Sequence, residues 1–238
     1  MVNLLEPTGL IGLLSFLMAL GAGIFLLYTY MNTKKLQRLI WGIGMVAYAS
    51  GHLIFAIAVL FEIRATDFEF FKFLIWFYIN ISGAITMGCM LAGVLPFFFE
   101  DNKVINWGLP VLYALGYFLG TTLFGYILPG NTPLNFINLE FMIMQTQYPT
   151  DSYFQYANMS WFAVEWLIPA SFAIGFLFLQ HYRQREAQPS LFIAIHFIGY
   201  ALLLFIWPFT ELKLIFYASR CAISALLLYG FWLMTKKD

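Results

Sequence analysis

The sequence carries very little charge. Only 12 basic and 12 acidic residues, 10% of the total, occur in 238 positions, whereas a soluble domain has about a quarter of its residues charged. Because 62% of the residues are hydrophobic and 20% are aromatic, the chain cannot cover a water-facing surface. The formal net charge is zero, which provides no field to attract nucleic acid. We therefore expect membrane lipids around the protein and no nucleic-acid partner.

Cysteine is scarce, and the common catalytic motifs are missing. The two cysteines, Cys89 and Cys221, both lie inside apolar runs, so neither a CxxC metal site nor a disulfide framework is indicated. The sequence contains no P-loop, HExxH, GxSxG or dinucleotide-binding fingerprint. An enzyme would have to be built from Glu165, His52 and Arg220 alone. We therefore expect a non-enzymatic protein.

Long apolar runs fill most of the chain. In hydrocarbon every backbone polar group must be paired internally, so a spanning segment is a helix or a strand of a closed barrel. Each run is about 20 residues or longer, whereas a barrel strand has about 10 alternating residues. The runs therefore predict one all-α domain over residues 1–238, an integral membrane bundle of seven transmembrane helices. The expected spans are 8–31, 39–62, 70–98, 105–128, 161–180, 190–210 and 213–234.

The distribution of Lys and Arg predicts the direction of the helices. Eight basic residues fall on one side of the expected spans and three on the other. The larger set is Lys34, Lys35, Arg38, Lys103, Arg183, Arg185, Lys236 and Lys237, and the smaller set is Arg64, Lys72 and Lys213. Because cytoplasmic loops carry the excess of Lys and Arg, we expect the N-terminus outside and the C-terminus inside.

One connection is longer than the others. Residues 129–160 are predicted to form an outer loop, whereas the remaining helices are joined by short segments. The stretch 135–144 is too apolar for a solvated linker and too short to span a bilayer. We expect it to lie across the outer mouth of the bundle.

Polar residues inside the membrane are costly and are therefore candidates for function. The sharpest pair is Glu165 with Arg220, because a buried guanidinium needs a carboxylate, carbonyl groups or water around it. By the helical rise of about 1.5 Å per residue, both fall in the outer half, as do His52, Asn80 and Ser82. Two interpretations remain open. The first is structural: the two residues form an ion pair, or their side chains extend separately to the outer headgroups. The second is a charged floor that orients an anionic or zwitterionic ligand. The second predicts an outward-facing pocket with these five residues as its ligand-binding set.

Two histidines suggest an alternative in which the bundle holds a cofactor. His52 and His196 fall on two of the expected helices, and paired imidazoles on neighbouring helices ligate haem iron in membrane cytochromes. Their expected depths bring them to a similar height only near the midplane. Hydrogen bonding of both histidines to neighbouring helices is the other interpretation, and we expect no metal site.

The sixth span ends with an aromatic residue and a proline, Trp207-Pro208. The proline ends or kinks the helix and frees a carbonyl group, so Trp207 joins the candidate ligand-binding residues. This element, the seven helices and the expected orientation together resemble microbial rhodopsins and seven-helix receptors, over the whole chain but as topology. A retinal protein needs a lysine in the middle of helix seven, whereas here Lys213 lies at its edge and Arg220 cannot form a Schiff base. Covalently bound retinal is therefore not expected.

The segment 39–45 is also similar to seven-helix proteins of bacteria and archaea to which no function is assigned. We therefore expect a multi-pass protein of the cell membrane, in particular of a prokaryotic plasma membrane. The leading hypothesis is a sensing or binding module for a small or lipidic ligand that works with a partner protein, as a homo-oligomer or a subunit of a membrane complex. A transporter or channel for small molecules or ions is the first alternative, and a haem-binding or other redox subunit is the second.

Overall fold

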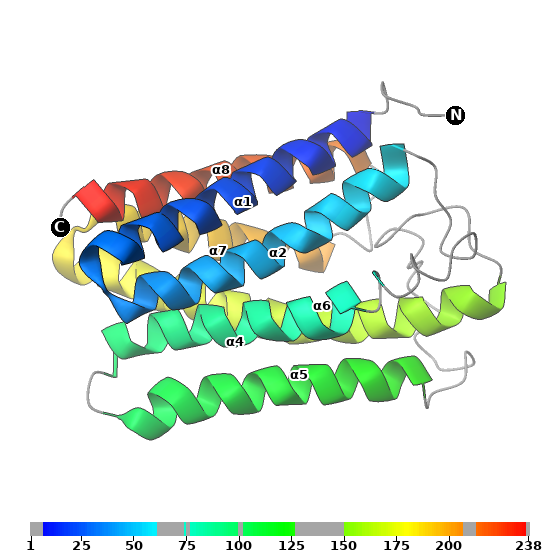
Figure 1. The fold of residues 1–238 in the computed structure, drawn as a ribbon, viewed down its shortest axis with the longest axis horizontal. Coiled ribbons are helices and arrows are strands. Elements are labelled where there is room, and N and C mark those ends of the chain that lie inside the picture. The colour runs from blue at the N-terminus through cyan, green and yellow to red at the C-terminus, as the bar shows by residue number, and fades with distance from the viewer. Residues whose placement is uncertain are drawn as a thin grey trace.

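The computed structural model describes residues 7–60, 74, 77–99, 102–126, 150–206 and 213–236, and their regular secondary structure is helical. The helices run along one another as a bundle (Figure 1). Its α-helices are α1 (Pro7–Thr33), α2 (Leu36–Leu60), α4 (Gly83–Val94), α5 (Leu109–Tyr126), α6 (Thr150–Arg185), α7 (Gln188–Ile206) and α8 (Lys213–Lys236). Two π-helical segments, η1 (Tyr78–Ser82) and η3 (Val104–Gly108), precede α4 and α5, and the 3₁₀ turn η2 (Leu95–Phe97) follows α4.

Five helices of the described part are long and apolar enough to cross a membrane. They are Gly9–Thr33, Asn80–Phe97, Val104–Thr122, Gln188–Phe205 and Ala218–Lys236. Each is about as long as the roughly 20 residues that a bilayer requires. The chain thus has the helices of a multi-pass membrane protein. The number of spans expected from the sequence is seven, because that expectation also counts α2 and α6 as membrane-crossing helices.

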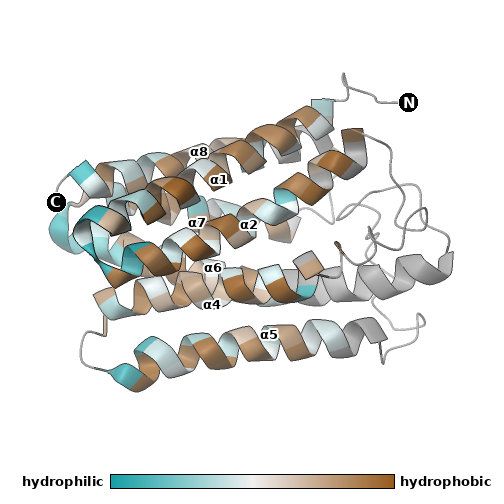
Figure 2. Cartoon of the chain, viewed as in Figure 1, coloured by the Kyte–Doolittle hydropathy of each residue, from teal (hydrophilic) through white to brown (hydrophobic). Residues whose placement is uncertain are grey.

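The helices follow one another around the bundle in chain order. Each packs against the next, from α1 and α2 through α4, α5, α6 and α7 to α8, and α8 then packs against α1 and closes the ring. The start of α1 and the end of α8 lie at opposite ends of the bundle (Figure 1). Hydrophilic residues gather at the end that carries the C-terminus (Figure 2). Among the described residues, this end holds Lys34, Lys35, Arg183, Arg185 and Lys236.

A tightly packed apolar core fills the half of the bundle nearest the basic end. Its centre is Trp41 of α2, which is only 2% exposed. The indole ring lies 4.8 Å from the ring of Phe231, 5.9 Å from that of Phe178 and 5.9 Å from that of Phe97. Its Nε1 donates a 3.4 Å hydrogen bond to the carbonyl oxygen of Met90. The core therefore ties α2, α4, α6 and α8 together.

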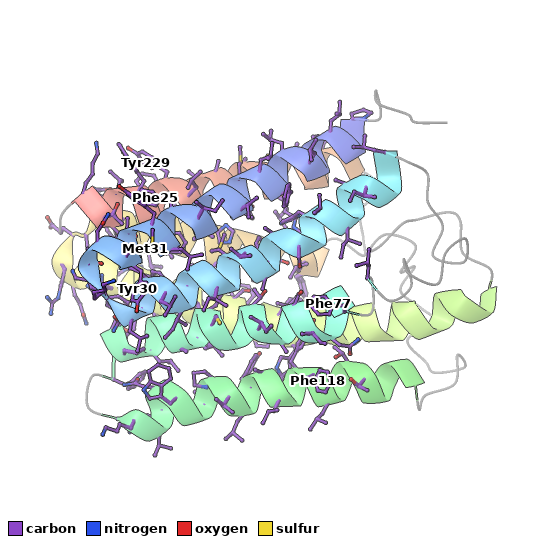
Figure 3. The ribbon with its side chains drawn as sticks, viewed as in Figure 1. Phe25, Tyr30, Met31, Phe77, Phe118 and Tyr229 are labelled. Carbon is purple, nitrogen blue, oxygen red and sulfur yellow. The ribbon has the colours of Figure 1, made fainter. Side chains whose placement is uncertain are left out.

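Large apolar side chains also cover the outside of the bundle. Met31 of α1 is 59% exposed and Tyr229 of α8 is 44% exposed, and both project from their helices (Figure 3). In water such a surface would be an aggregation hazard. Around a membrane protein it is the surface that lipid covers.

The structure places part of the predicted outer loop in helix α6. Residues 129–160 were expected to be a loop, but α6 already begins at Thr150; residues 127–149 lie outside the described residues. With 36 residues, α6 is about 54 Å long by the helical rise, which exceeds a hydrocarbon core of about 30 Å. An apolar run in the sequence marks only the part of a helix that lipid surrounds. The prediction therefore missed the polar and aromatic segment with which α6 begins.

A mutual contact joins α5 to α6. The hydroxyl of Tyr113 donates to the carbonyl oxygen of Trp166, and Nε1 of Trp166 donates to the carbonyl oxygen of Tyr113 over 3.2 Å. Pro169 lies inside α6, where a proline removes one intrahelical hydrogen bond. Tyr113 thus contacts α6 in the turn where Pro169 interrupts the backbone hydrogen bonds of that helix.

Candidate functional site

The structure divides the predicted ligand-binding residues into separate groups. His52 and Arg220 share one cluster, in which both contact Tyr48. Asn80 and Ser82, both in η1, belong to a second group of contacts between α2, η1 and α5. Glu165 lies in α6, but its side chain is outside the described part of the structure, as is all of Trp207.

Arg220 of α8 lies over two tyrosine rings. Its guanidinium carbon is 5.9 Å from the ring centre of Tyr48 on α2 and 5.3 Å from that of Tyr200 on α7. Nη2 of Arg220 also donates a 3.4 Å hydrogen bond to the hydroxyl of Tyr200. A cation above an aromatic face is attracted by the ring quadrupole, and more strongly where water is excluded. The two tyrosines thus hold the arginine at the junction of three helices.

The two histidines flank this pair of tyrosines. The ring of His52 lies 4.7 Å from that of Tyr48, edge to face, and Tyr48 lies 6.1 Å from Tyr200. His196 stacks on Tyr200 at 6.1 Å, with the planes 4° apart. The four rings therefore form a continuous series, His52, Tyr48, Tyr200 and His196, between α2 and α7. We call these four residues together with Arg220 the arginine cluster.

The backbone of α8 fixes the orientation of His196. Its Nδ1 lies 2.8 Å from the carbonyl oxygen of Ile223. Because a carbonyl oxygen can only accept a hydrogen bond, Nδ1 carries the proton. Nε2 of a neutral His196 is then an acceptor. His196 is also only 3% exposed, so Nε2 lies inside the bundle, where it can accept a hydrogen bond from a buried donor.

The hydroxyl of Tyr48 and Nε2 of His52 are buried and have no hydrogen-bond partner among the described residues. His52 as a whole is only 5% exposed. A buried polar group without a partner costs about 1–3 kcal/mol, so two in adjacent side chains mark this cluster as a place where a bound group would be stabilised.

The second group is, in contrast, fully engaged. Oδ1 of Asn80 accepts hydrogen bonds from Thr121 at 2.7 Å and from Thr122 at 3.2 Å. The hydroxyls of Ser50 and Ser82 are 3.1 Å apart. Side-chain hydrogen bonds of this kind hold transmembrane helices together. Asn80 and Ser82 therefore fit the role of connecting η1 to α2 and α5 better than that of free ligand contacts.

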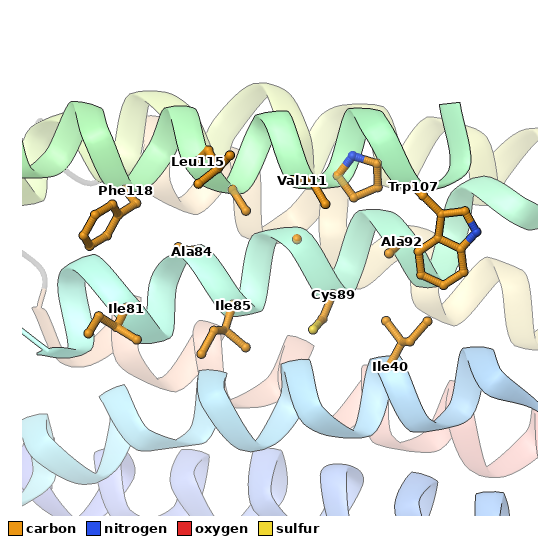
Figure 4. Close-up of a pocket in the computed structure, with 13 residues that line it drawn as sticks. Ile40, Ile81, Ala84, Ile85, Cys89, Ala92, Trp107, Val111, Leu115 and Phe118 are labelled. Atoms are coloured by element: carbon orange, nitrogen blue, oxygen red, sulfur yellow. The ribbon is translucent and has the colours of Figure 1, made fainter. Parts of the chain in front are cut away.

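A hollow that the sequence interpretation missed lies between α4 and α5. It has a volume of about 530 Å³ and an entirely apolar lining, and the four predicted ligand-binding residues whose side chains the structure describes, His52, Asn80, Ser82 and Arg220, do not contribute to it (Figure 4). Its floor includes Ala84, Gly88 and Ala92, which recur every four residues along α4. That spacing places small residues on one helix face. It is the feature of the sequence from which the hollow could have been predicted.

The described residues contain no group of three or more His, Cys, Asp or Glu side chains that could hold a metal ion. The histidine pair of the haem hypothesis is present, with His52 and His196 at the two ends of the ring series. Haem binding stays an alternative hypothesis beside the prediction of no cofactor.

A membrane bundle with an arginine, two histidines and two tyrosines packed between α2, α7 and α8 defines the class: a multi-pass α-helical membrane protein with a buried polar cluster. No protein-family model, curated protein sequence or solved structure matches the chain. The resemblance to rhodopsins and receptors therefore stays a prediction from topology.

Proposed function

We propose that this chain is a non-enzymatic seven-helix membrane module that binds a small or lipidic ligand at the arginine cluster and works with a partner protein. One observation carries the proposal: the hydroxyl of Tyr48 and Nε2 of His52 are buried beside Arg220 without a hydrogen-bond partner among the described residues. A ligand that hydrogen-bonds to both atoms would remove their desolvation cost.

The chemistry of the cluster favours an anionic group on the ligand. Arg220 is always protonated and presents several N–H donors. Tyr48 can donate through its hydroxyl, and His52 can donate or accept according to its tautomer. A carboxylate or a phosphate uses all three, because charge-assisted hydrogen bonds are roughly twice as strong as neutral ones. The apolar surroundings suit an alkyl chain attached to that group.

Titration with a fatty acid tests this proposal. Sodium oleate is added to the purified protein in a neutral detergent, with oleyl alcohol as the uncharged match and sodium acetate as the small anion, and the melting temperature is followed. We expect oleate to raise it in the native protein and not in Arg220→Leu or in the double variant Tyr48→Phe/His52→Leu. Acetate acting alone would indicate a small ligand.

Tyr229→Phe is the control, because Tyr229 is exposed on α8, and it should respond to oleate like the native protein. The proposal is rejected if oleyl alcohol acts as well as oleate, or if both cluster variants keep the full response. Mass spectrometry of molecules that co-purify with the protein provides an independent measurement, because a native anionic ligand should be missing from Arg220→Leu.

We also propose that all seven helices cross the membrane, with the N-terminus outside and the C-terminus inside. Hydrophilic residues gather at one end of the bundle (Figure 2), and Lys34, Lys35, Arg183, Arg185 and Lys236 lie at that end, which supports this orientation. Single cysteines introduced at Lys35 and at Ser152, in a background of Cys89→Ser and Cys221→Ser, test it in intact cells. A membrane-impermeant maleimide should label the cysteine at position 152 and leave the one at position 35 unlabelled. The opposite pattern would reverse the topology, and labelling of both would contradict the count of spans.

A further inference from the structure

The hollow between α4 and α5 is an open groove on the outside of the bundle. Its walls include Ile85, Val111 and Leu115, which are 39%, 55% and 51% exposed. Its floor is made of small residues, among them Gly88, where an added Cβ would lie 3.1 Å from Cβ of Ala114. Because the two helices approach each other through these small residues while larger side chains rise on both sides, an apolar channel is left between them (Figure 4).

The length of the groove matches one leaflet of a bilayer. Along η3 and α5 the lining extends from Trp107 to Phe118, which is about 17 Å by the helical rise. The hydrocarbon core of a bilayer is about 30 Å thick, so the groove spans roughly half of it. It begins near the basic end of the bundle, since Trp107 lies in the segment that opens α5. The leaflet concerned is therefore the one at that end.

Both ends of the groove coincide with π-helical segments. Ile81 belongs to η1 and Trp107 belongs to η3. Short π-helical segments are rare and occur often at functional sites. These π-helical segments are an observation independent of the shape of the groove. They show that the backbone departs from α-helix at both ends of the groove lining.

Charge is available where the groove meets the membrane surface. Lys103 is exposed and precedes Trp107 by about one helical turn, which places it on the same side of the chain. Tryptophan and lysine at the headgroup level are typical anchors in membrane proteins. A cation at this end complements a phosphate group, and the lining beyond it offers only hydrocarbon.

We propose that this groove binds one acyl chain of an anionic phospholipid from the leaflet at the basic end, with the lipid phosphate beside Lys103. Lipid tails are as apolar as the lining, so the chain is held by close packing rather than by exclusion of water. Selectivity for the headgroup then comes from Lys103, since a basic residue at the membrane surface favours anionic lipid by about fivefold in affinity. This site is separate from the arginine cluster.

Native mass spectrometry of the detergent-purified protein tests the proposal, with palmitoyl-oleoyl-phosphatidylglycerol and palmitoyl-oleoyl-phosphatidylcholine as probes. We expect the native protein to retain phosphatidylglycerol preferentially. Ala84→Phe, which fills the floor, should lower that retention by about tenfold or more. Leu112→Phe adds a phenyl ring at a 68% exposed position of α5 outside the groove and should have no effect. Lys103→Gln should reduce the preference for phosphatidylglycerol about fivefold and leave phosphatidylcholine binding unchanged.

A measurement on the native protein avoids reliance on folding of the variants. Phosphatidylglycerol with a diazirine in its acyl chain is incorporated into phosphatidylcholine vesicles that hold the protein, and the crosslinked peptides are identified. We expect crosslinks concentrated on α4 and α5. Crosslinks spread equally over α1 and α8 would overturn the proposal. Equal lipid retention by Ala84→Phe and Leu112→Phe would also overturn it, and so would a dimer of the native protein that Ala84→Phe dissociates, because the occupant would then be a second copy of the chain.

Discussion

The indole of Trp41 lies directly against the backbone of α4 at Gly93. A Cβ atom added at position 93 would overlap Nε1 and Cδ1 of the indole. Trp41 cannot retreat, because Phe178 and Phe231 enclose it from α6 and α8. The absence of a side chain at Gly93 is thus what allows the largest residue of the core to reach α4.

We therefore expect Gly93→Ala to destabilise the protein by about 1–3 kcal/mol, the usual cost of overpacking. The melting temperature in detergent measures the loss. Gly21→Ala is the matched control, because nothing lies within 4 Å of a Cβ added there, and it should melt like the native protein. Trp41→Phe combined with Gly93→Ala should lose less than the two single losses added together. Equal melting of Gly93→Ala and Gly21→Ala would show that Trp41 does not contact α4 in this way.

A double-mutant cycle can measure the contact between Asn80 and Thr121. Asn80→Leu and Thr121→Val remove the hydrogen bond while nearly keeping the volumes, and side-chain hydrogen bonds between membrane helices contribute about 0.6 kcal/mol, up to about 1.7. We expect a coupling energy in that range from unfolding in a denaturing detergent. Asn80→Leu paired with Thr29→Val, whose hydroxyl bonds within α1 to the carbonyl of Leu26, should give a value near zero. Equal coupling in both pairs would contradict the contact.

Glu186 directly follows α6 (Thr150–Arg185) and has a φ of 49°. This left-handed conformation costs a non-glycine residue about 1 kcal/mol or more. Its carboxylate also lies near the negative end of the helix dipole. We expect Glu186→Gly to stabilise the protein by about 0.5–1 kcal/mol, measured by thermal unfolding. Ala187→Gly, one residue further, lacks the positive φ and should bring no gain. A loss of stability in Glu186→Gly would argue against a left-handed residue at this helix end.

His181 should make stability depend on pH. Its ring lies 2.7 Å from the hydroxyl of Ser190 on α7, and burial, followed by the charge of Arg185, lowers the pKa of His181 below its ordinary value of 6.5. The unfolded chain therefore binds the proton more readily than the fold does. The stabilising contribution is complete above pH 6.5 and is lost as the pH falls below it toward the folded pKa.

His181→Asn should accordingly weaken the fall in melting temperature between about pH 7.5 and about pH 5.5. Arg185→Gln should weaken it as well, because one cause of the lowered pKa is removed. An unchanged pH profile in His181→Asn would assign the dependence to other groups.

The sequence predicts the helices well because each is a long apolar run. The spans expected at 8–31 and 39–62 correspond to α1 (Pro7–Thr33) and α2 (Leu36–Leu60). The groups that meet inside the bundle could not be predicted to the same extent. The helical rise gives the depth of a residue, but a helix that is apolar all round gives no signal of its rotation. His52 and Asn80 were therefore expected in one pocket, whereas His52 contacts Tyr48 and Asn80 contacts Thr121.

Because the packing of the bundle is uneven, one part of it should open before the whole protein unfolds. The end around Trp41 is a dense apolar block that ties four helices together. The level of Tyr48 and Tyr200, in contrast, contains buried polar groups that find only some of their hydrogen-bond partners among the described residues. Backbone amides near Trp41 should therefore resist hydrogen exchange until the whole bundle unfolds, and those of α7 around Tyr200 should exchange in smaller, earlier openings.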